Sequence, residues 1–247
     1  QAEDGIRDFC LSRGLGDVYK RQILIFVSIP FLTFAQDKTV ADTLLPMEFQ
    51  RQIFIYGAAK KYNDKMMQIA TLYNLLSYNP NNGAILDSIA LAYFEGQQYV
   101  SAALVSVDAV SLNPKDELGA EIAALSFEQI GASERALKYY ETLYLLRNDI
   151  MILYQVSFLQ YRLKRLNEAF TNVDIIIEDT TSNEVQIIFP KDDESEQKVA
   201  LKIAAKRLKA MIFVQKENIV EAKKLYEDIL SSSPDFDLAR KQLEDLK

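Results

Sequence analysis

The sequence predicts an all-α protein, a solenoid of about five stacked helix pairs with one small β-hairpin inserted. Two series of residues spaced by 34 predict the pairs: the prolines Pro80 and Pro114, and the aromatic residues Tyr93, Phe127 and Tyr161. A fixed period of this length is typical of helical repeats, in which each pair buries its apolar face against its neighbours. The alternative, an irregular helical bundle, would produce both series only by coincidence.

The predicted pairs follow one another along the chain. The first is expected at about residues 49–82 and is atypical, as a terminal repeat often is. The second and third keep the period, and the fourth is looser because its alanine, Ala169, comes one residue early. The last pair ends before Pro234, which lies 18 residues beyond the position that the period predicts. An insertion therefore separates the fourth and fifth pairs.

Small and aromatic residues recur within the pairs for a packing reason. Alanines let paired helices approach closely, and aromatic side chains fill the space between neighbouring pairs, where burying one ring contributes on the order of 1.5–3 kcal/mol. Left-handed glycines are expected to end first helices, and Ser or Asn side chains to cap second helices. The residues in these roles are Ala90, Ala102, Ala124 and Ala136; Tyr93, Phe127, Tyr140 and Tyr226; Gly96 and Gly131; and Ser133, Asn167 and Asn218.

This pattern resembles the tetratricopeptide repeat (TPR), in which small and aromatic residues mark the first helix, alanine and an aromatic residue mark the second, and proline follows. The resemblance implies a TPR-like α-α superhelix over residues 36–247, with a concave groove lined mainly by the first helix of each pair. It places nine candidate partner-binding residues on that groove: Asp87, Leu91, Phe94, Glu121, Leu125, Glu128, Gln155, Leu159 and Arg162.

The nine candidate residues would form a ladder of leucines flanked by mostly acidic side chains. Such walls suit a basic or amphipathic peptide, bound as a helix or as an extended chain. The groove lacks the Lys, Asn and Arg set with which some TPR proteins hold a C-terminal carboxylate, so that ligand is not expected. The alternative is that the nine are ordinary exposed helix positions without a ligand.

The insertion is expected to form a β-hairpin over about residues 183–201. The β-prone segment 185–189 should pair with 197–201 and project between the fourth and fifth helix pairs, with Ile187 or Phe189 as a partner contact. The acidic residues near its turn lack the spacing of a helix-loop-helix calcium site, so a solvated acidic turn is favoured. These acidic residues are Asp192, Asp193, Glu194 and Glu196.

Two N-terminal segments are expected to lie outside the repeat domain. Residues 1–22 resemble the translation of a DNA sequencing adaptor rather than native protein, since they can be back-translated into its sequence (QAEDGIRDFCLSRGLGDVYKRQ). Residues 23–35 have the apolar run and small-residue end of a secretory signal peptide whose start is missing. This run is too short to span a bilayer as a helix. The alternative is a buried first element of a cytosolic domain.

Composition narrows the chemistry that the chain can perform. It has 28 basic and 35 acidic residues and a net charge of −7, which argues against nucleic acid or an anionic membrane surface as a partner. It has no histidine, and its one cysteine, Cys10, lies in the adaptor-like stretch. The commonest general base, thiolate chemistry and zinc sites built on His or Cys are therefore excluded, and no catalytic residue, metal or cofactor is expected.

These observations predict a non-catalytic protein-interaction scaffold or adaptor of the bacterial cell envelope. It would be periplasmic after cleavage of the signal peptide and would then have no membrane span. The expected partner is a protein or a peptide held in the concave groove. Two alternatives remain: a cytosolic TPR scaffold, and a non-catalytic subunit of an envelope enzyme or secretion complex.

Overall fold

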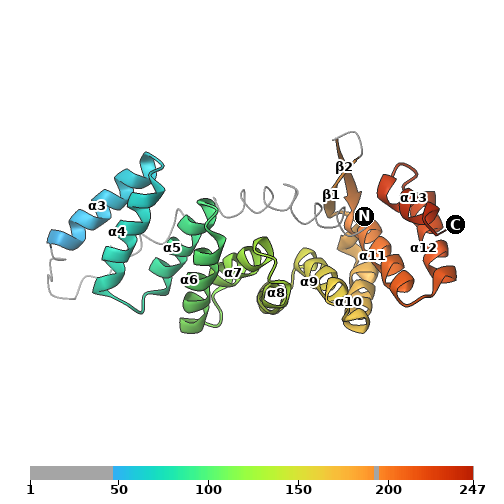
Figure 1. Cartoon of the computed structure of the whole chain (residues 1–247), viewed down its shortest axis with the longest axis horizontal. Helices are drawn as coiled ribbons and strands as arrows, with labels where there is room; N and C mark the ends of the chain where they lie inside the picture. The colour runs from blue at the N-terminus through green and yellow to red at the C-terminus, as the bar shows by residue number, and fades with distance from the viewer. Residues whose placement is uncertain (1–46, 192–194, 247) are drawn as a thin grey trace. The chain divides into compact units, whose positions relative to one another are not determined.

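The computed structural model describes residues 47–191 and 195–246 (Figure 1). These residues divide into two compact units, the N-terminal unit up to Ile152 and the C-terminal unit from Leu153. The adaptor-like stretch at 1–22, the signal peptide at 23–35 and the acidic residues Asp192, Asp193 and Glu194 lie outside the described residues. In the described part of the chain, no helix is both long and apolar enough to cross a bilayer.

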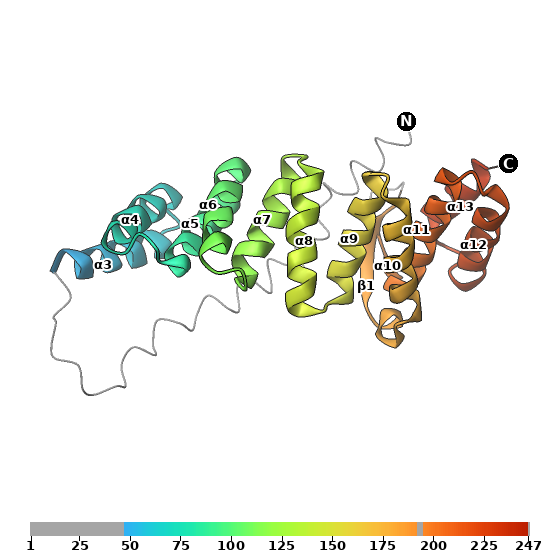
Figure 2. The same ribbon diagram turned by 90° about the horizontal axis from the view of Figure 1, so that it is seen from below.

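The N-terminal unit consists of three helix pairs that follow one another (Figures 1 and 2). The pairs are α3 (Met47–Lys61) with α4 (Lys65–Tyr78), α5 (Gly83–Glu95) with α6 (Tyr99–Leu112), and α7 (Glu117–Gln129) with α8 (Ser133–Arg147). The second helices begin at 34-residue intervals, at Lys65, Tyr99 and Ser133, which confirms the predicted period. Helix α4 also contacts α5, and α6 contacts α7, so the three pairs form a continuous stack within the unit.

The C-terminal unit contains the remaining helix pairs, the β-hairpin and a final single helix. Its elements are α9 (Ile150–Arg162), which begins just before the boundary, α10 (Leu166–Glu178), the 3-10 turn η2 (Thr180–Asn183), β1 (Gln186–Pro190), β2 (Glu196–Ala200), α11 (Leu201–Gln215), α12 (Ile219–Ser232) and α13 (Asp237–Glu244). The predicted fold class, an all-α repeat of five helix pairs with one small β-hairpin, is confirmed.

The turn inside each helix pair is closed in the same way in all five pairs of the described chain. One residue of each turn has a positive φ, between 55° and 74° in the five pairs. The next N–H then donates to a carbonyl five residues earlier, as Ala132 does to Phe127 at 2.8 Å across Gly131. This is the Schellman arrangement of a helix C-terminus. The other four donor–acceptor pairs are Asp64–Ala59, Gln98–Tyr93, Arg165–Gln160 and Asn218–Phe213, at 2.8–2.9 Å.

This closure explains where the expected caps are right and where they are wrong. Gly131 has the predicted left-handed conformation, but Gly96 has φ −80°, and the left-handed residue of that turn is Gln97. The residue whose N–H closes the turn is also the N-cap of the second helix. Asn218 occupies that position and caps α12, whereas Ser133 and Asn167 come too late and lie inside their helices.

The core runs between neighbouring pairs, where small residues of one pair meet a branched residue of the next. In the N-terminal unit, Ala90 of α5 and Ala102 of α6 form a buried cluster with Ile122 of α7. Tyr93 packs against the same cluster, as expected for an aromatic residue between pairs. The other alanines of the repeat pattern, Ala124, Ala136, Ala169 and Ala222, are also fully buried.

The β-hairpin forms as predicted, but its apolar residues do not project toward a partner. The two strands pair antiparallel, with Phe189 opposite Gln197. Ile187 is buried and Phe189 is 0% exposed, its ring 5.1 Å from that of Phe236. The prediction of Ile187 or Phe189 as a partner contact is therefore wrong. A two-stranded hairpin is marginal by itself, so its apolar face packs on the C-terminal unit.

We expect replacement of Gly131 by alanine to lower the free energy of unfolding by about 1–2 kcal/mol, because a Cβ atom is unfavourable at its φ of 74°. The matched control is Gly83→Ala at the start of α5, where φ is ordinary and an added Cβ meets nothing within 4 Å. That change should be neutral or slightly stabilising. Urea denaturation of both variants measures the difference, and equal effects would contradict this explanation of the turn.

Candidate functional site

The nine predicted partner-binding residues belong to three first helices. Asp87, Leu91 and Phe94 lie on α5, and Glu121, Leu125 and Glu128 lie on α7; these two helices are in contact within the N-terminal unit. Gln155, Leu159 and Arg162 lie on α9, in the part of it that belongs to the C-terminal unit. The structure thus brings together the first six residues, and binding at all nine stays a prediction.

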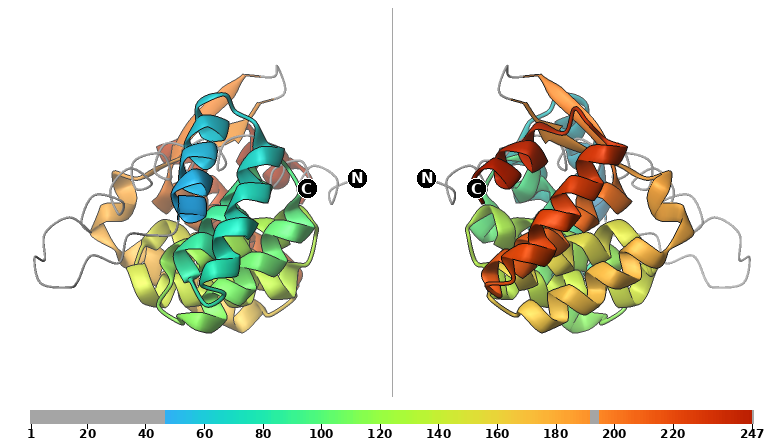
Figure 3. Two further views of the ribbon diagram at one scale, coloured as in Figure 1. Left: turned by 90° about the vertical axis from the view of Figure 1, so that its left-hand side faces the viewer. Right: turned by 90° about the vertical axis from the view of Figure 1, so that its right-hand side faces the viewer.

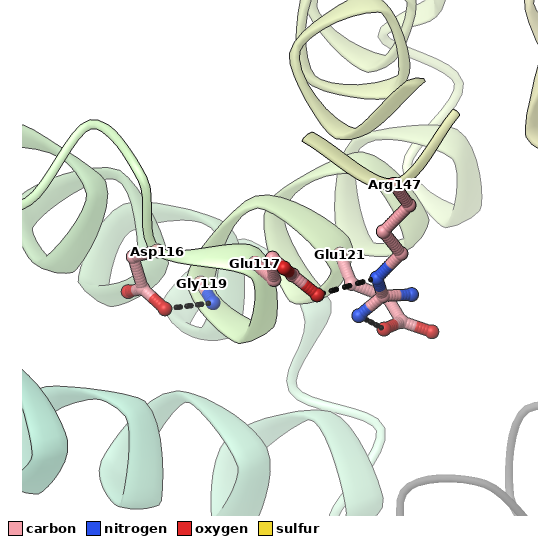
Figure 4. Close-up of polar contacts among 5 residues, drawn as sticks. All are labelled: Asp116, Glu117, Gly119, Glu121 and Arg147. Atoms are coloured by element: carbon pink, nitrogen blue, oxygen red, sulfur yellow. Dashed lines mark hydrogen bonds and ion pairs between the residues drawn. The ribbon is translucent and has the colours of Figure 1, made fainter. Parts of the chain in front are cut away.

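Asp87 has the most unusual environment of the six. It is half-buried, and its Oδ1 atom is buried without a hydrogen-bond partner in the described structure. Burial, together with the charge of Asp116 and a hydrogen bond to it, raises the pKa of Asp87 to about 8. Asp116 itself caps α7, since its Oδ1 accepts the Gly119 N–H at 3.1 Å (Figure 4). The two carboxyl groups therefore hold a proton between them at neutral pH.

Two apolar side chains follow Asp87 on the same helix. Leu91 and Phe94 are only half-buried, and both pack their inner sides against the cluster of Ala90, Ala102 and Ile122. Because Leu91 lies one helical turn beyond Asp87, the carboxyl group and the apolar side chains share one side of α5. This face, defined by Asp87, Leu91 and Phe94, is called the α5 face below.

The acidic residues of α7 are held by partners within the chain. Glu121 is 4% exposed, and its Oε2 accepts from an Arg147 guanidinium nitrogen at 2.7 Å, while Arg147 Nε donates to Glu117 at 2.9 Å (Figure 4). Burial alone lowers the pKa of Arg147, but its hydrogen bonds to the two carboxylates and their charges outweigh this, and the pKa is raised. Arg147 thus ties the end of α8 to the first half of α7.

The remaining candidate residues differ in how much surface they offer. Glu128 is half-buried and accepts a hydrogen bond from the Tyr140 hydroxyl at 2.7 Å. Leu125, Gln155 and Leu159 are buried, and Arg162 is half-buried. A partner therefore has more side-chain surface to contact on the α5 face than at the buried positions of α7 and α9.

Two residues that shape this region are not predicted from the sequence. Asp116 has a local signal, since an aspartate directly before a helix is a typical N-cap. The proximity of Asp116 to Asp87 has no local signal in the sequence, because the two residues lie on different repeats. Arg147 also has no local signal, because its partner Glu117 is 30 residues earlier. Among the described residues, no group of three or more His, Cys, Asp or Glu side chains is placed to hold a metal ion.

Solved structures share this fold at low sequence identity. YrrB, described as a TPR protein with an unusual peptide-binding site, has a TM-score of 0.61 and 14% identity, covering 78% of this chain and 90% of YrrB. A TPR protein from Parabacteroides merdae ATCC 43184 has a TM-score of 0.57 and 19% identity, covering 80% and 72%. MamA has a TM-score of 0.55 and 15% identity, covering 74% and 90%.

The fold is therefore that of TPR proteins, as the sequence pattern predicts. No protein-family model and no curated protein matches the sequence.

We expect Asp87→Asn to change how stability depends on pH. The folded chain keeps the Asp87 proton up to about pH 8, whereas an ordinary aspartate loses it near its usual value of 3.8. Folding therefore takes up a proton between these values, and the free energy of unfolding falls as the pH rises from about 4 to about 8. The variant, which cannot ionise at this position, should lose this part of the decline.

Thermal unfolding of the wild type and the variant at several pH values measures this effect. In a chain of this size, each kcal/mol in the free energy of unfolding shifts Tm by about 2–4 °C. The exposed Glu134→Gln on α8 is a control that removes one carboxylate elsewhere in the same unit. Parallel pH profiles for the wild type and Asp87→Asn would contradict the protonation of Asp87 at neutral pH.

Proposed function

We propose that the chain is a non-catalytic scaffold that binds a basic or amphipathic peptide, or such a segment of a protein, on the first-helix side of its repeats. The TPR-type fold supports the general role, because stacked helix pairs form extended binding surfaces. YrrB, which has a similar fold, is described as having a peptide-binding site. The chemistry of the ligand is inferred from the residues of this chain.

The observation that carries the proposal is the carboxyl pair of Asp87 and Asp116 beside the half-buried Leu91 and Phe94. A lysine or arginine of a partner can take the place of the shared proton, since a nearby cation stabilises both carboxylates in their charged form. The two apolar side chains then offer a contact for leucine-like residues one or two turns along a bound helix.

The net charge of the chain agrees with this choice of ligand. With a net charge of −7, the protein attracts cationic partners over distances set by the ionic strength and repels anionic ones. The acidic side chains Glu117 and Glu121 are neutralised in part by Arg147. Among the described residues, no lysine or arginine forms an ion pair with Asp87 or Asp116, so we infer that a partner supplies the cation.

We further propose that the scaffold works in the bacterial cell envelope after export. The support is the apolar run of Ile23–Phe34 followed by Ala35 and polar residues, which has the pattern of a signal peptide. A cytosolic scaffold is the alternative, and a non-catalytic subunit of an envelope enzyme or secretion complex is a variant of the same role.

Peptide binding is measured with two synthetic amphipathic helices that differ only in charge, one bearing leucines and lysines and the other leucines and glutamates. Fluorescence anisotropy should give a Kd for the lysine peptide that is about tenfold lower or better, a difference of about 1.4 kcal/mol. Its affinity should rise between pH 7 and pH 9, because binding requires the Asp87 carboxyl to lose its proton.

Leu91→Ala should weaken binding of the lysine peptide, while Leu145→Ala, a change of the same kind at an exposed position on α8, should leave it unchanged. Circular dichroism of both variants checks that the helices remain. Equal affinity for the two peptides, or equal loss in both variants, is the result that rejects the α5 face as the binding site.

Export is tested with a reporter enzyme that is active only outside the cytoplasm, fused after residues 23–38 preceded by Met and two lysines. Activity is expected for this fusion and should be lost when Phe26 is replaced by aspartate, which interrupts the apolar run. An inactive first fusion would favour the cytosolic scaffold and would leave the peptide-binding result unaffected.

A further inference from the structure

The C-terminal unit buries the side chain of Arg207, which belongs to α11 and is 5% exposed. Its Nε atom donates to the side-chain oxygen of Gln242 in α13 at 2.8 Å. Its guanidinium carbon lies 5.6 Å from the centre of the Phe189 ring in β1, and the face of an aromatic ring attracts a cation. The inserted hairpin and the last described helix therefore both hold this guanidinium group in place.

The hairpin and α13 also contact each other. The Phe189 ring lies 5.1 Å from the ring of Phe236, the N-cap residue of α13. Gln197 of β2 donates to the Asp235 carbonyl oxygen at 3.0 Å. Figures 1 and 3 show the hairpin and α13 on the same side of the C-terminal unit. The surroundings of Arg207 are thus a packed part of the fold, and its position is fixed from several elements.

Arg207 is buried without a counter-ion, unlike the equivalent residue of an earlier repeat. It lies 12 residues before the first residue of α12, as Glu121 lies 12 residues before the first residue of α8. Glu121 is 4% exposed and pairs with Arg147. Among the described residues, no aspartate or glutamate forms an ion pair with Arg207. An isolated buried charge is unfavourable, and arginine is rarely buried without a partner.

The tyrosines around Arg207 do not supply the missing negative charge. Burial lowers the pKa of Arg207, and the nearby Tyr154, Tyr226 and Tyr161 offset this only in part. Burial raises the pKa of Tyr226 and of Tyr161 above the ordinary value of 10, so both hydroxyl groups are neutral at pH 7. The guanidinium itself keeps its proton. Arg207 is therefore a buried cation that the described residues do not neutralise.

Two nitrogens of the guanidinium remain for a ligand. Among the described residues, Arg207 has a hydrogen-bond partner for Nε alone. Neither Nη1 nor Nη2 is among the described polar atoms that are fully buried without a partner, so both keep some contact with solvent. Together they present donors that fit the two oxygens of a carboxylate. One guanidinium also balances the single negative charge of one carboxylate.

The small exposure of Arg207 indicates how such a carboxylate reaches it. Because the side chain is only 5% exposed, the carboxylate has to enter on a narrow stem. A glutamate side chain carries its carboxylate on flexible methylene groups. A terminal carboxylate is attached directly to the backbone, whose polar groups would have to be buried with it at a cost.

We propose that Arg207 binds the side-chain carboxylate of a glutamate in an acidic peptide, with Nη1 and Nη2 each donating to one oxygen. This site in the C-terminal unit takes an anionic group, whereas the α5 face takes a cationic one. The two sites share no residue, so binding at Arg207 does not depend on the proposed peptide binding at the α5 face.

The Nε–H signal of Arg207 in the isotope-labelled full chain reports binding by NMR. Three small probes are titrated: acetyl-glutamate amide, the uncharged acetyl-glutamine amide, and acetyl-alanine, whose only carboxylate is terminal. Acetyl-glutamate amide should shift the signal saturably in the millimolar range, acetyl-alanine should bind more weakly, and acetyl-glutamine amide should cause no shift. If acetyl-glutamate amide causes no saturable shift, or if acetyl-alanine binds equally well or better, the proposal is overturned.

Two variants test the same site through the backbone amide signals of α11. Arg207→Met should raise the Kd of acetyl-glutamate amide about tenfold or more, because it removes both donors, and a buried charge replaced by an apolar side chain usually leaves a stable fold. Gln242→Glu supplies an internal carboxylate at Nε, so it should raise Tm and weaken binding. The exposed Arg165→Met is the control and should bind as the wild type does. Unchanged binding in Arg207→Met or in Gln242→Glu contradicts the proposal.

Discussion

One backbone hydrogen bond, repeated five times, determines how the described chain is built. In each helix pair an N–H reaches back five residues across a left-handed residue and closes the first helix at the point where the second begins. Four of these left-handed residues are not glycine, although the conformation costs each of them about 1–2 kcal/mol. The packing of the pairs must offset that cost. As a result, the same repeat positions of every first helix face its own second helix. The same repeat positions also lie on the opposite side of every first helix.

The sequence is most informative where one local pattern is repeated. The period gives the starts of α4, α6 and α8 and the buried alanines, because these depend only on position within the repeat. It fails by one residue at Gly96 and Ser133, where the closing hydrogen bond, and not the residue type, selects the left-handed residue and the cap. It also fails at Phe189, whose burial depends on Phe236 far along the chain.

The candidate site, too, can be predicted from the sequence only in part. The positions on α5 and α7 follow from the period, but their surroundings do not, because each depends on a charged residue of another helix. Asp116 sits beside Asp87 and raises its pKa, and Arg147 binds Glu121. Two residues at equivalent repeat positions thus have different chemistry, one neutral at pH 7 and the other in an ion pair.

The shared closure of the five pairs is tested most directly by amide hydrogen exchange in the full chain. The amides of Asp64, Gln98, Ala132, Arg165 and Asn218 are the five donors. They are expected to exchange as slowly as amides inside the neighbouring helices, because they open only when the pair itself opens. Exchange at the rate of an unfolded chain at Ala132, in the middle of the N-terminal stack, would contradict a hydrogen-bonded turn and the repeat geometry that follows from it.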